Sequence, residues 1–404
     1  MVNTNSKQID QILSRGLEEV IGKDTLREKM LSGNKVKLYL GIDPTSTELH
    51  IGHMVPLLKL HDFMELGHEV IFLVGNFTAL IGDTSDKESM RPAITSEDIE
   101  KNLITYQQQA SKILDFSKVK IVFNKDWLEP LSFKEIIELA QEFTLKPFID
   151  RELMAKRLKE EKPIGLHELL YPIMQGYDAY HMDVDLQVGG TDQRFNMLTG
   201  RDLQKKRRGK EMAIITTPLI MGTDGRKMSK SYKNGININD SAIDKYGKAM
   251  SITDENIIPY FKLTTRVTDE EIMQIEKDLA QNSNPMDYKK QLALAITTLY
   301  NGKEEAINAQ KHFESVVQNN EIPKNIATIN IGTKEISILD LMEQSGLTTS
   351  RSASRKLIEQ GGVSIDNNKV KNNSEIVKVE NSERILQVGK RKFAKFNNLE
   401  PVER

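Results

Sequence analysis

Regular alternation of hydrophobic and polar positions begins just after Lys35. Three apolar residues, Val36, Leu38 and Leu40, share one parity of the chain. Tyr39 takes the other parity, so this period of two predicts a β-strand with Tyr39 on its less hydrophobic side.

A turn and a helix follow this strand. Gly41 and Asp43-Pro44 break regular structure, and apolar residues then recur at helical spacing as far as Gly67. The helix opens with His50-Ile51-Gly52-His53, so two imidazoles lie at an end that carries unpaired N–H groups and a partial positive charge. Gly52 lets a ligand approach the backbone. This arrangement suits a triphosphate, although two polar residues at a helix start also occur without a ligand.

Strand and helix patterns alternate further along the chain. The apolar run of residues 69–75 predicts a strand covered on both faces, and the order strand, helix, strand implies a parallel pair with a right-handed crossover. Residues 125–165 are helical and too long for a simple crossover, so we interpret them as an insertion whose apolar residues, Trp127 among them, form a subunit interface or more core. We also expect strands at 119–123, 184–188 and 213–220, a helix over 96–116 capped by Ser96, and helical structure over 6–31.

Residues 166–181 predict a helix with a polar face. Tyr171, Gln175 and Asp178 are spaced to share that face, and an apolar stripe from Leu166 to Tyr177 covers much of the other side. The polar face is either a solvated surface or part of a cleft. Because it leads directly into the expected strand 184–188, the cleft is favoured.

Two loops after strands carry candidate ligand contacts. The loop 76–91 lies outside the carboxyl end of a strand, where ligands gather in α/β sheets, and it contains Asp83, Lys87 and Arg91. These charges are either solvated or contact a phosphate or an ammonium group. The segment Gly189 to Gln193 allows close backbone approach, and Asp192 within it fits either a helix N-cap or a ligand contact.

Two basic segments have different interpretations. Lys227 and Lys230 lie three residues apart in a glycine-containing loop and suit the closure of a loop over phosphates. The run 205–208, with Lys210, complements the C-terminus of a helix, and contact with RNA is the minority alternative.

Composition limits the class of protein. The 404 residues suffice for two or three domains, and without cysteine the chain has neither disulfides nor thiolate chemistry, in agreement with a reducing compartment. No apolar run is long enough to span a membrane, and the N-terminus lacks the pattern of a secretory signal. Residues 337–396 contain eleven Lys or Arg against seven Asp or Glu, so this module is at +4 while the rest of the chain is at −6. A basic module on an acidic body suggests a polyanionic partner.

Two segments together resemble a known family. HIGH at 50–53 and KMSKS at 227–231, in this order on a strand–helix frame, are similar to the paired signatures of the class I aminoacyl-tRNA synthetases. The chain is most similar to the tyrosyl-tRNA synthetases, over nearly its whole length. The likeness rests on YLGIDPTSTELHIGH, LIGDTSDKESMR, YPIMQGYDAY, QVGGTDQRFN, KMSKS and an S4-like C-terminal module.

This resemblance implies an α/β fold, with a Rossmann-like parallel sheet catalytic domain and helical insertion, an α-helical domain and a small α+β S4-like domain. The expected ranges are 1–235 (insertion about 125–165), 236–320, a linker at 321–335, and 336–404. The implied activity joins L-tyrosine to tRNA(Tyr) through tyrosyl-AMP. ATP with Mg²⁺ is the implied co-substrate, without an organic cofactor or a bound-metal site, and the protein is expected to be a cytoplasmic homodimer.

The resemblance also implies a role for each matching residue. The implied tyrosine contacts are Tyr39 and Asp178 at the phenol, Tyr171, Gln175 and Asp83 at the α-ammonium, and Gln193 near the carboxylate or ribose. The implied ATP contacts are Gly41, His50, Gly52, His53, Asp192 and Lys230. The implied catalytic groups are Thr45, His50, His53, Lys87, Arg91, Lys227 and Lys230. The expected RNA contacts are Arg351, Arg355 and Lys356.

This set of residues fits the chemistry. A carboxylate is ionised at pH 7 and attacks a phosphate without a general base, so catalysis is mostly positioning and electrostatic stabilisation. Tryptophanyl-tRNA synthetase is the nearest alternative, and Tyr39 with Asp178 argues against it. Small adenylyltransferases share the HxGH start but are much shorter. An amino-acid-dependent exchange assay distinguishes the tryptophanyl alternative. A catalytically silent RNA-binding protein is the alternative from another class, and formation of adenylate with ATP, Mg²⁺ and tyrosine would exclude it.

Overall fold

The computed structural model describes residues 2–45, 47–83, 95–230, 232–315, 326, 328–348, 350–389 and 392–398. The chain forms two compact units, Met1–Asn301 and Gly302–Arg404. The finer division expected from the sequence stays a prediction.

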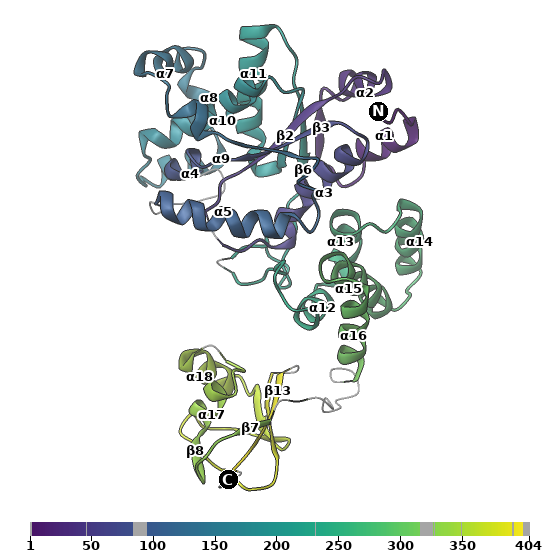
Figure 1. Ribbon diagram of the computed structural model, residues 1–404, viewed down its shortest axis with the longest axis vertical. Helices are drawn as coiled ribbons and strands as arrows, with labels where there is room; N and C mark the ends of the chain where they lie inside the picture. The colour runs from purple at the N-terminus through teal and green to yellow at the C-terminus, as the bar shows by residue number, and fades with distance from the viewer. Residues whose placement is uncertain are drawn as a thin grey trace. The chain divides into compact units, whose positions relative to one another are not determined.

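A six-stranded sheet forms the centre of the first unit (Figure 1). Its strand order is β1-β6-β5-β2-β3-β4, and all neighbouring strands are parallel except β1, which pairs antiparallel with β6. This confirms the expected α/β class with a mostly parallel sheet. The strands are β1 Glu19–Ile21, β2 Lys37–Ile42, β3 Glu69–Val74, β4 Lys120–Phe123, β5 Leu186–Gly190 and β6 Ala213–Thr217.

Helices cover this sheet and continue beyond it. Those up to β6 are α1 Ser6–Ile12, α2 Lys23–Leu31, α3 Ile51–Glu65, α4 Thr78–Ile81, α5 Ser96–Ala110, α6 Lys125–Leu128, α7 Phe133–Ala140, α8 Leu145–Ile149, α9 Glu152–Lys159, α10 Leu166–Met182, the 3₁₀ turn Thr191–Gln193, and α11 Arg194–Arg208. After β6 the helices of this unit are α12 Ala242–Met250, the 3₁₀ turn Asp254–Asn256, α13 Ile257–Thr264, α14 Asp269–Ala280 and α15 Pro285–Asn301.

The strand order reverses between β2 and β5, and this reversal creates the crevice of the fold. From β2 the chain crosses through α3 to β3 on one side, whereas from β5 it crosses through α11 to β6 on the other. Right-handed crossovers in opposite directions place α3 and α11 on opposite faces of the sheet. In such sheets the crevice opens at the carboxyl ends of the two strands where the order reverses.

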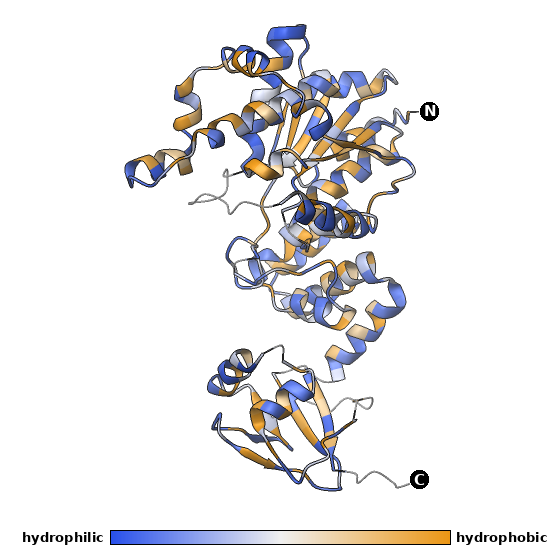
Figure 2. Cartoon of the chain, turned by 60° about the vertical axis from the view of Figure 1, so that its left-hand side comes forward, coloured by the Kyte–Doolittle hydropathy of each residue, from blue (hydrophilic) through white to orange (hydrophobic). Residues whose placement is uncertain are grey.

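Both faces of the sheet are buried, and Figure 2 shows its strands as largely hydrophobic. Every residue of β3 from Val70 to Val74 is buried, as the continuous apolar run predicted. The less hydrophobic side predicted for Tyr39 is not a solvent-exposed side, because Tyr39 is fully buried. Helices on both sides of the sheet exclude solvent, so the alternation of residues along β2 does not separate solvent-exposed from buried positions.

The N-terminal segment differs from the expected helical stretch 6–31. It forms α1, then β1, then α2. α1 ends at Ile12 with Leu13 as its C-cap. Gly16 and Gly22 both have a positive φ: Gly16 lies in the turn between α1 and β1, and Gly22 is the N-cap of α2. β1 consists of only three residues, and its pairing with β6 holds it in the sheet.

The helix expected over 96–116 is shorter than predicted. Thr95, not Ser96, caps it. The Thr95 hydroxyl accepts a hydrogen bond from the Asp98 N–H at 3.2 Å, and the Asp98 carboxylate accepts one from the Thr95 N–H. This is a capping box, and the helix ends at Ala110.

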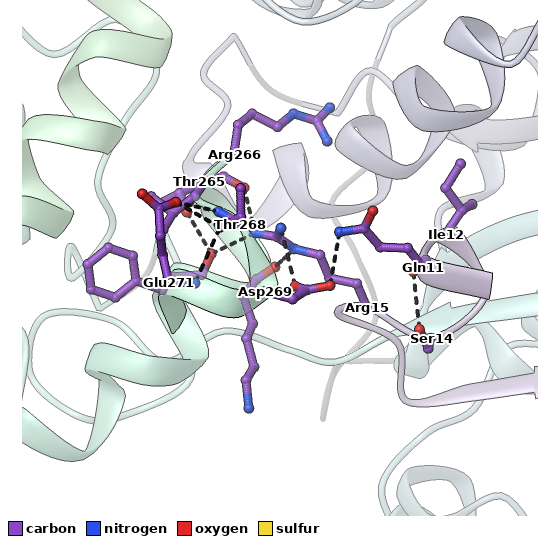
Figure 3. A network of polar contacts seen from close by, with 12 residues as sticks. Gln11, Ile12, Ser14, Arg15, Thr265, Arg266, Thr268, Asp269 and Glu271 are labelled. Carbon is purple, nitrogen blue, oxygen red and sulfur yellow. Dashed lines mark hydrogen bonds and ion pairs between the residues drawn. The ribbon is translucent and has the colours of Figure 1, made fainter. Parts of the chain in front are cut away.

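A polar network joins the N-terminal segment to the start of α14 (Figure 3). Gln11 Nε2 donates to Asp269 Oδ2 at 2.9 Å, and Arg15 forms an ion pair with the same carboxylate at 3.3 Å. Arg15 also donates to the carbonyl oxygen of Thr265 at 3.2 Å. Residues more than 240 positions apart are thereby held together within the first unit.

The second unit contains α16 and a small α+β fold. Five strands are ordered β10-β9-β12-β13-β7, and β11 pairs with β8. Its core includes Leu341, Leu386 and Phe396. Strand β7 falls inside the range 321–335 that was expected to be linker. The elements are α16 Lys303–Phe313, α17 Ile338–Gln344, α18 Arg351–Glu359, β7 Thr328–Asn330, β8 Glu335–Ser337, β9 Val363–Ile365, β10 Asn368–Lys369, β11 Ile376–Lys378, β12 Arg384–Val388 and β13 Lys392–Asn397.

Within the described ranges, no helix is long and apolar enough to cross a bilayer.

A buried ion pair anchors the start of α10, and its loss tests how that helix is held. Arg157 forms two hydrogen bonds to the Glu168 carboxylate, at 2.6 and 3.0 Å, and both residues are 1% exposed. Arg157→Ala leaves the Glu168 charge buried without this partner, so we expect the free energy of unfolding to fall by about 3–5 kcal/mol. Lys101→Ala removes the exposed Lys101–Glu97 pair and is the control, with an expected loss below about 1 kcal/mol. Urea unfolding measures both, and equal losses would contradict this account.

Candidate active site

A polar pocket opens at the carboxyl ends of β2 and β5, where the strand order reverses. Its cavity volume is about 250 Å³. The predicted residues that line it are Tyr39, Gly41, Thr45, His53, Asp83, Tyr171, Gln175, Asp178, Asp192 and Gln193. The fold thus brings predicted residues from five separate segments of the chain to one place.

At the back of the pocket lies the carboxyl group of Asp178, which is 2% exposed. Its Oδ1 accepts a hydrogen bond from Trp127 Nε1 at 2.7 Å, and its Oδ2 accepts one from Asn124 Nδ2 at 3.2 Å. Burial raises the pKa of Asp178 to about 8, and the two donors lower it in part. Asp178 is therefore mostly protonated at pH 7 and close to half-protonated only near pH 8.

Tyr39 lies beside this carboxyl group. Its hydroxyl donates to the carbonyl oxygen of Gln175 at 3.5 Å. Burial raises the pKa of the Tyr39 phenol well above its usual value, and the nearby Asp178 carboxylate raises it further. A phenol that stays protonated next to a carboxyl group provides a donor and an acceptor at the same end of the pocket.

The other end of the pocket gathers amides, carboxylates and a phenol. Gln193 Nε2 donates to Asp83 Oδ2 at 2.7 Å. Asn196 Nδ2 donates to the side-chain oxygens of Gln175 and Gln193, both at 3.1 Å. Tyr171 donates its hydroxyl to another carboxylate, that of Asp43. This cluster of acceptor oxygens around Asp83 suits an ammonium group.

Asp43 connects the two ends of the pocket. Its Oδ2 accepts from the Tyr171 hydroxyl at 2.9 Å, and its Oδ1 accepts from the Thr78 hydroxyl at 2.8 Å. Thr78 in turn accepts from Asn124 Nδ2 at 3.0 Å, and Asn124 reaches Asp178. One hydrogen-bonded chain therefore runs from the cluster at Tyr171 to the buried carboxyl group.

The sequence analysis missed Asp43, Thr78, Asn124, Asn196 and Gln187, and it considered Trp127 only as core or interface. Gln187 lines the pocket, is 2% exposed, and has a buried Oε1 without a hydrogen-bond partner. A positional signal was available for three of these residues. Asp43, Thr78 and Asn124 follow the carboxyl ends of the parallel strands β2, β3 and β4, which is where ligand contacts gather.

The two predicted histidines lie together at the start of α3. His50 is its N-cap, the His50 N–H donates to His53 Nδ1 at 3.2 Å, and the ring centroids are 3.8 Å apart. Burial, then Lys230 and Lys227, lower the pKa of His50 to about 4, and burial lowers that of His53 well below its usual value. Both imidazoles are neutral at pH 7, so they offer hydrogen bonds rather than charge.

Gly52, between the histidines, leaves room at this helix start. A Cβ at Gly52 would lie 3.0 Å from the His50 ring and from Ile220, so a side chain here would crowd the surface on which a ligand is expected to pack. Gly41 lines the pocket from the end of β2.

The loop that carries Lys227 and Lys230 adjoins the start of α3. The Ile51 N–H donates to the Ile236 carbonyl at 2.9 Å, and residues 50 and 237 form a β-bridge. Both lysines lower the pKa of His50 by their positive charge, which places their ammonium groups near this helix start. Lys87 and Arg91, also predicted here, lie outside the described residues.

Asp192 lines the pocket but is not a helix N-cap. It lies within the 3₁₀ turn Thr191–Gln193, and α11 begins after Gln193. The N-cap alternative is therefore wrong, because a further turn separates Asp192 from the α-helix. A Cβ at Gly190 would meet Asp192 Oδ1 at 2.5 Å, so Gly190 makes room for this carboxylate.

The basic run at the end of α11 is engaged with nearby acidic groups. Arg207 pairs with Glu142 at 3.2 Å, Arg208 with Asp183 at 3.0 Å, and Lys205 with Glu211 at 2.8 Å. These pairs support the structural interpretation of the run.

The second unit holds the predicted RNA contacts on α18. Arg355 and Lys356 are exposed there. Arg351 is exposed too, and it pairs with Asp340 and Glu343 of the preceding helix. Among the described residues of the whole chain, no cluster of three or more His, Asp or Glu side chains could hold a metal ion.

Comparison with known families agrees with this geometry. The family of class I tRNA synthetases for W and Y matches residues 31–318, and the S4 domain family matches residues 338–382. The chain therefore belongs to the class I tRNA synthetases, with an S4 domain at its C-terminal end.

Individual relatives narrow the family assignment further. The tyrosine–tRNA ligase of Thermotoga maritima is 41% identical over 389 residues, which cover 96% of each chain. That of Moorella thermoacetica is 40% identical over 393 residues, covering 96% of this chain and 95% of the relative. Within its class, the chain thus belongs to the tyrosyl-tRNA synthetases.

Solved structures show the same fold. The tyrosyl-tRNA synthetase of Archaeoglobus fulgidus, complexed with L-tyrosine, aligns with a TM-score of 0.61 and 24% identity over 76% of this chain and 100% of that one. A C-terminally truncated mitochondrial tyrosyl-tRNA synthetase of Aspergillus nidulans aligns with a TM-score of 0.63 and 21% identity, over 76% and 93% of the two chains.

The raised pKa of Asp178 predicts a pH dependence of stability. The folded protein keeps a proton that the unfolded chain releases near pH 4, so the stabilisation from this proton is complete below about pH 4 and declines as the pH rises toward 8. Asp178→Asn cannot lose this proton. Relative to the parent, the variant should therefore gain stability between pH 5 and 8, by up to about 1.4 kcal/mol per pH unit.

Urea unfolding at several pH values measures this difference, with Asp202→Asn on the exposed side of α11 as the matched control. A difference between Asp178→Asn and the parent that does not change with pH would show that Asp178 is ionised in the folded protein.

Proposed function

We propose that the protein is a tyrosine–tRNA ligase that activates L-tyrosine with ATP and transfers it to the 3′ end of tRNA(Tyr). The observation that best supports this proposal is the buried Asp178 carboxyl group beside the buried Tyr39 phenol, at the back of a pocket in a class I synthetase fold. The ligase relatives add support through their similarity over almost the whole chain.

In this proposal tyrosine enters with its phenol toward Asp178 and Tyr39. Its α-ammonium is held by Asp83, Tyr171 and Gln175. Gln193 lies near the carboxylate or ribose, and the carboxylate faces the start of α3. The existing hydrogen bonds among these side chains preset their positions, so little ordering remains to be done when the substrate binds.

ATP would lie between α3 and the loop of Lys227 and Lys230. Gly41 and Gly52 allow its adenosine to approach the backbone, and Asp192 accepts from the ribose. A tyrosine carboxylate oxygen forms a bond to the α-phosphorus as the bond to pyrophosphate breaks, so tyrosyl-AMP and pyrophosphate result. The negative charge that accumulates on the leaving phosphates is stabilised by hydrogen bonds and ammonium groups. The proposed groups are Thr45, His50, His53, Lys87, Arg91, Lys227 and Lys230.

Mg²⁺ would arrive with ATP, held by the phosphate oxygens. The second step joins the tyrosyl group to a hydroxyl of the terminal ribose of tRNA and releases AMP. We place the RNA contacts of the second unit on the exposed face of α18, at Arg351, Arg355 and Lys356. A cytoplasmic location is proposed, in line with a cysteine-free chain suited to a reducing compartment.

Selectivity for tyrosine follows from the same pocket. Phenylalanine would fill the buried end of the pocket at Asp178 and Tyr39 without offering a hydrogen-bonding group, whereas the tyrosine hydroxyl can donate to one of these groups and accept from the other. Rejection of phenylalanine by about 10⁵-fold, a magnitude measured for tyrosyl-tRNA synthetases themselves, needs no editing site.

We also propose that the protein is a homodimer whose subunits meet at α7 and α10. Phe133 and Leu166, on these two helices, are 78% and 81% exposed. Between the helices lies an apolar cavity of about 190 Å³ that Leu139, Leu170 and Met174 help to line. Large apolar side chains around an apolar hollow are typical of a surface covered by a partner, and a second copy of the chain presents the same helices.

The central experiment is ATP–pyrophosphate exchange with single amino acids. The parent should exchange with tyrosine and not with tryptophan. Asp178→Ala should lower kcat/KM for tyrosine by about 10²-fold or more, because the buried hydrogen bond between the Asp178 carboxyl group and the substrate phenol is lost. Asp202→Ala is the matched control and should keep the parental rate. Exchange that depends on tryptophan, or parental rates in Asp178→Ala, would overturn the pocket assignment.

Sedimentation tests the dimer. The parent should sediment as a dimer, and Leu166→Glu should shift it toward the monomer, because a charge is placed in an apolar interface. Ile104→Glu changes an equally hydrophobic side chain, 61% exposed on α5, and should leave the dimer intact. A monomeric parent, or equal effects of both variants, would argue against this interface.

A further inference from the structure

The loop that carries Lys227 and Lys230 is built around the side chain of Asn234. This residue is 3% exposed, in contrast to most of the loop. Its carboxamide oxygen accepts from the Ser229 N–H at 2.9 Å, and its carboxamide nitrogen donates to Asp224 Oδ1 at 2.7 Å and to the Lys227 carbonyl at 3.1 Å. One side chain thereby joins three separate points of the loop.

The backbone of Asn234 adds a fourth point. Its carbonyl accepts from the Thr223 N–H at 3.0 Å, so the two arms of the loop are tied together where the loop begins and ends. After the loop, residues 236–238 pair with the segment at the start of α3. Before the lysines, the chain closes on itself, because the Met228 N–H donates to the Ile220 carbonyl at 3.0 Å. The lysines lie between these fixed points.

An asparagine is the residue type that satisfies this position. The site needs one acceptor for an N–H and two donors for a carboxylate and a carbonyl, at the end of a short side chain, and the asparagine amide supplies all of them. An aspartate would keep the acceptor, lose the donors and place a second carboxylate against Asp224. A leucine or alanine would remove all three of these side-chain hydrogen bonds.

Gly222 gives independent support from the opposite side of the contact. A Cβ at Gly222 would lie 2.3 Å from the carboxamide carbon and nitrogen of Asn234, and 2.7 Å from its carbonyl oxygen. The φ of Gly222 is not in the left-handed region, so the backbone conformation does not require glycine there. Glycine is required there because the Asn234 amide occupies the space that a side chain at position 222 would need.

We propose that Asn234 is a positioning residue for catalysis, whose carboxamide holds the lysine loop in order over the start of α3 before ATP binds. This inference rests on the proposed function, in which Lys227 and Lys230 stabilise the leaving pyrophosphate. We call the hydrogen bonds of the Asn234 side chain to Asp224, Lys227 and Ser229 the clamp. Without the clamp, the loop has to be ordered at the cost of conformational entropy in every turnover. The lysine ammonium groups then reach the phosphates less often in the geometry that the transition state requires.

Asn234→Ala tests the clamp, with Asn239→Ala as the matched control because Asn239 is an exposed asparagine five positions away. We expect kcat for tyrosine-dependent pyrophosphate exchange to fall by about 10- to 100-fold in Asn234→Ala, with the KM for tyrosine and the thermal midpoint unchanged. Asn239→Ala should match the parent in every measurement. A merely structural role of Asn234 would instead lower the thermal midpoint and weaken tyrosine binding together.

Limited proteolysis supplies a readout that does not depend on activity. Trypsin cleaves after Lys and Arg, and the loop offers Arg226, Lys227, Lys230 and Lys233. Cleavage within the loop, mapped by mass spectrometry on the full chain, should be faster in Asn234→Ala than in the parent or in Asn239→Ala. Equal cleavage in all three proteins would overturn the proposal.

Two further substitutions probe the mechanism of the clamp. Gly222→Ala should reproduce the kinetic and proteolytic changes of Asn234→Ala, because the new methyl group displaces the amide. Asn234→Asp should be as impaired as Asn234→Ala despite its identical shape, and adding Asp224→Asn should restore part of the rate by returning a donor to the contact. Full activity of Asn234→Asp would show that only the shape of the side chain matters and would contradict the proposal.

Lys230→Ala separates this inference from the proposed function. It should lose on the order of 10²-fold in exchange, because one electrostatic group at the transition state is removed. If Lys230→Ala keeps the parental rate, the role given to the loop is wrong. If Lys230→Ala is impaired while Asn234→Ala is not, the loop acts as proposed and the clamp alone is refuted.

Discussion

Burial of the Asp178 carboxyl group is the constraint on which the pocket depends. A carboxyl group out of contact with water needs hydrogen-bond partners, and here they come from Trp127 and Asn124. Asn124 continues through Thr78 and Asp43 to Tyr171. A connected polar network in a buried site is stable only when nearly all of its members are satisfied, so the residues just after β2 and β4 and those on α4, α6 and α10 are fixed in position together.

Chain topology decides where this network lies. Because the strand order reverses between β2 and β5, the start of α3 and the start of α11 both face the crevice, and the loops after β3 and β4 border it. The groups proposed to bind phosphate, the candidate tyrosine pocket and the lysine loop thus share one edge of the sheet.

Local pattern was enough to predict some of this from the sequence. The period of two gave β2, the period of 3.6 gave α3 with His50 at its start, and the spacing of Tyr171, Gln175 and Asp178 gave their common face. Contacts set by the whole fold were missed. Trp127 resembles an ordinary core residue until α6 is placed against α10, and β1 is too short to be recognised before β6 pairs with it. Asn234 follows the lysine motif without any pattern, since its role arises only when the loop closes on itself.

The N-terminal strand β1 has a consequence for assembly of the chain. An open sheet edge exposes unpaired N–H and C=O groups that invite pairing with another molecule. β1 covers the β6 edge, and the opposite edge, β4, is only four residues long and includes an exposed lysine, Lys120. Because β1 is synthesised nearly two hundred residues before β6, its partner is already on hand when β6 leaves the ribosome. The edge of β6 is thereby paired within its own chain, and the strand left at the edge of the sheet, β1, is only three residues long.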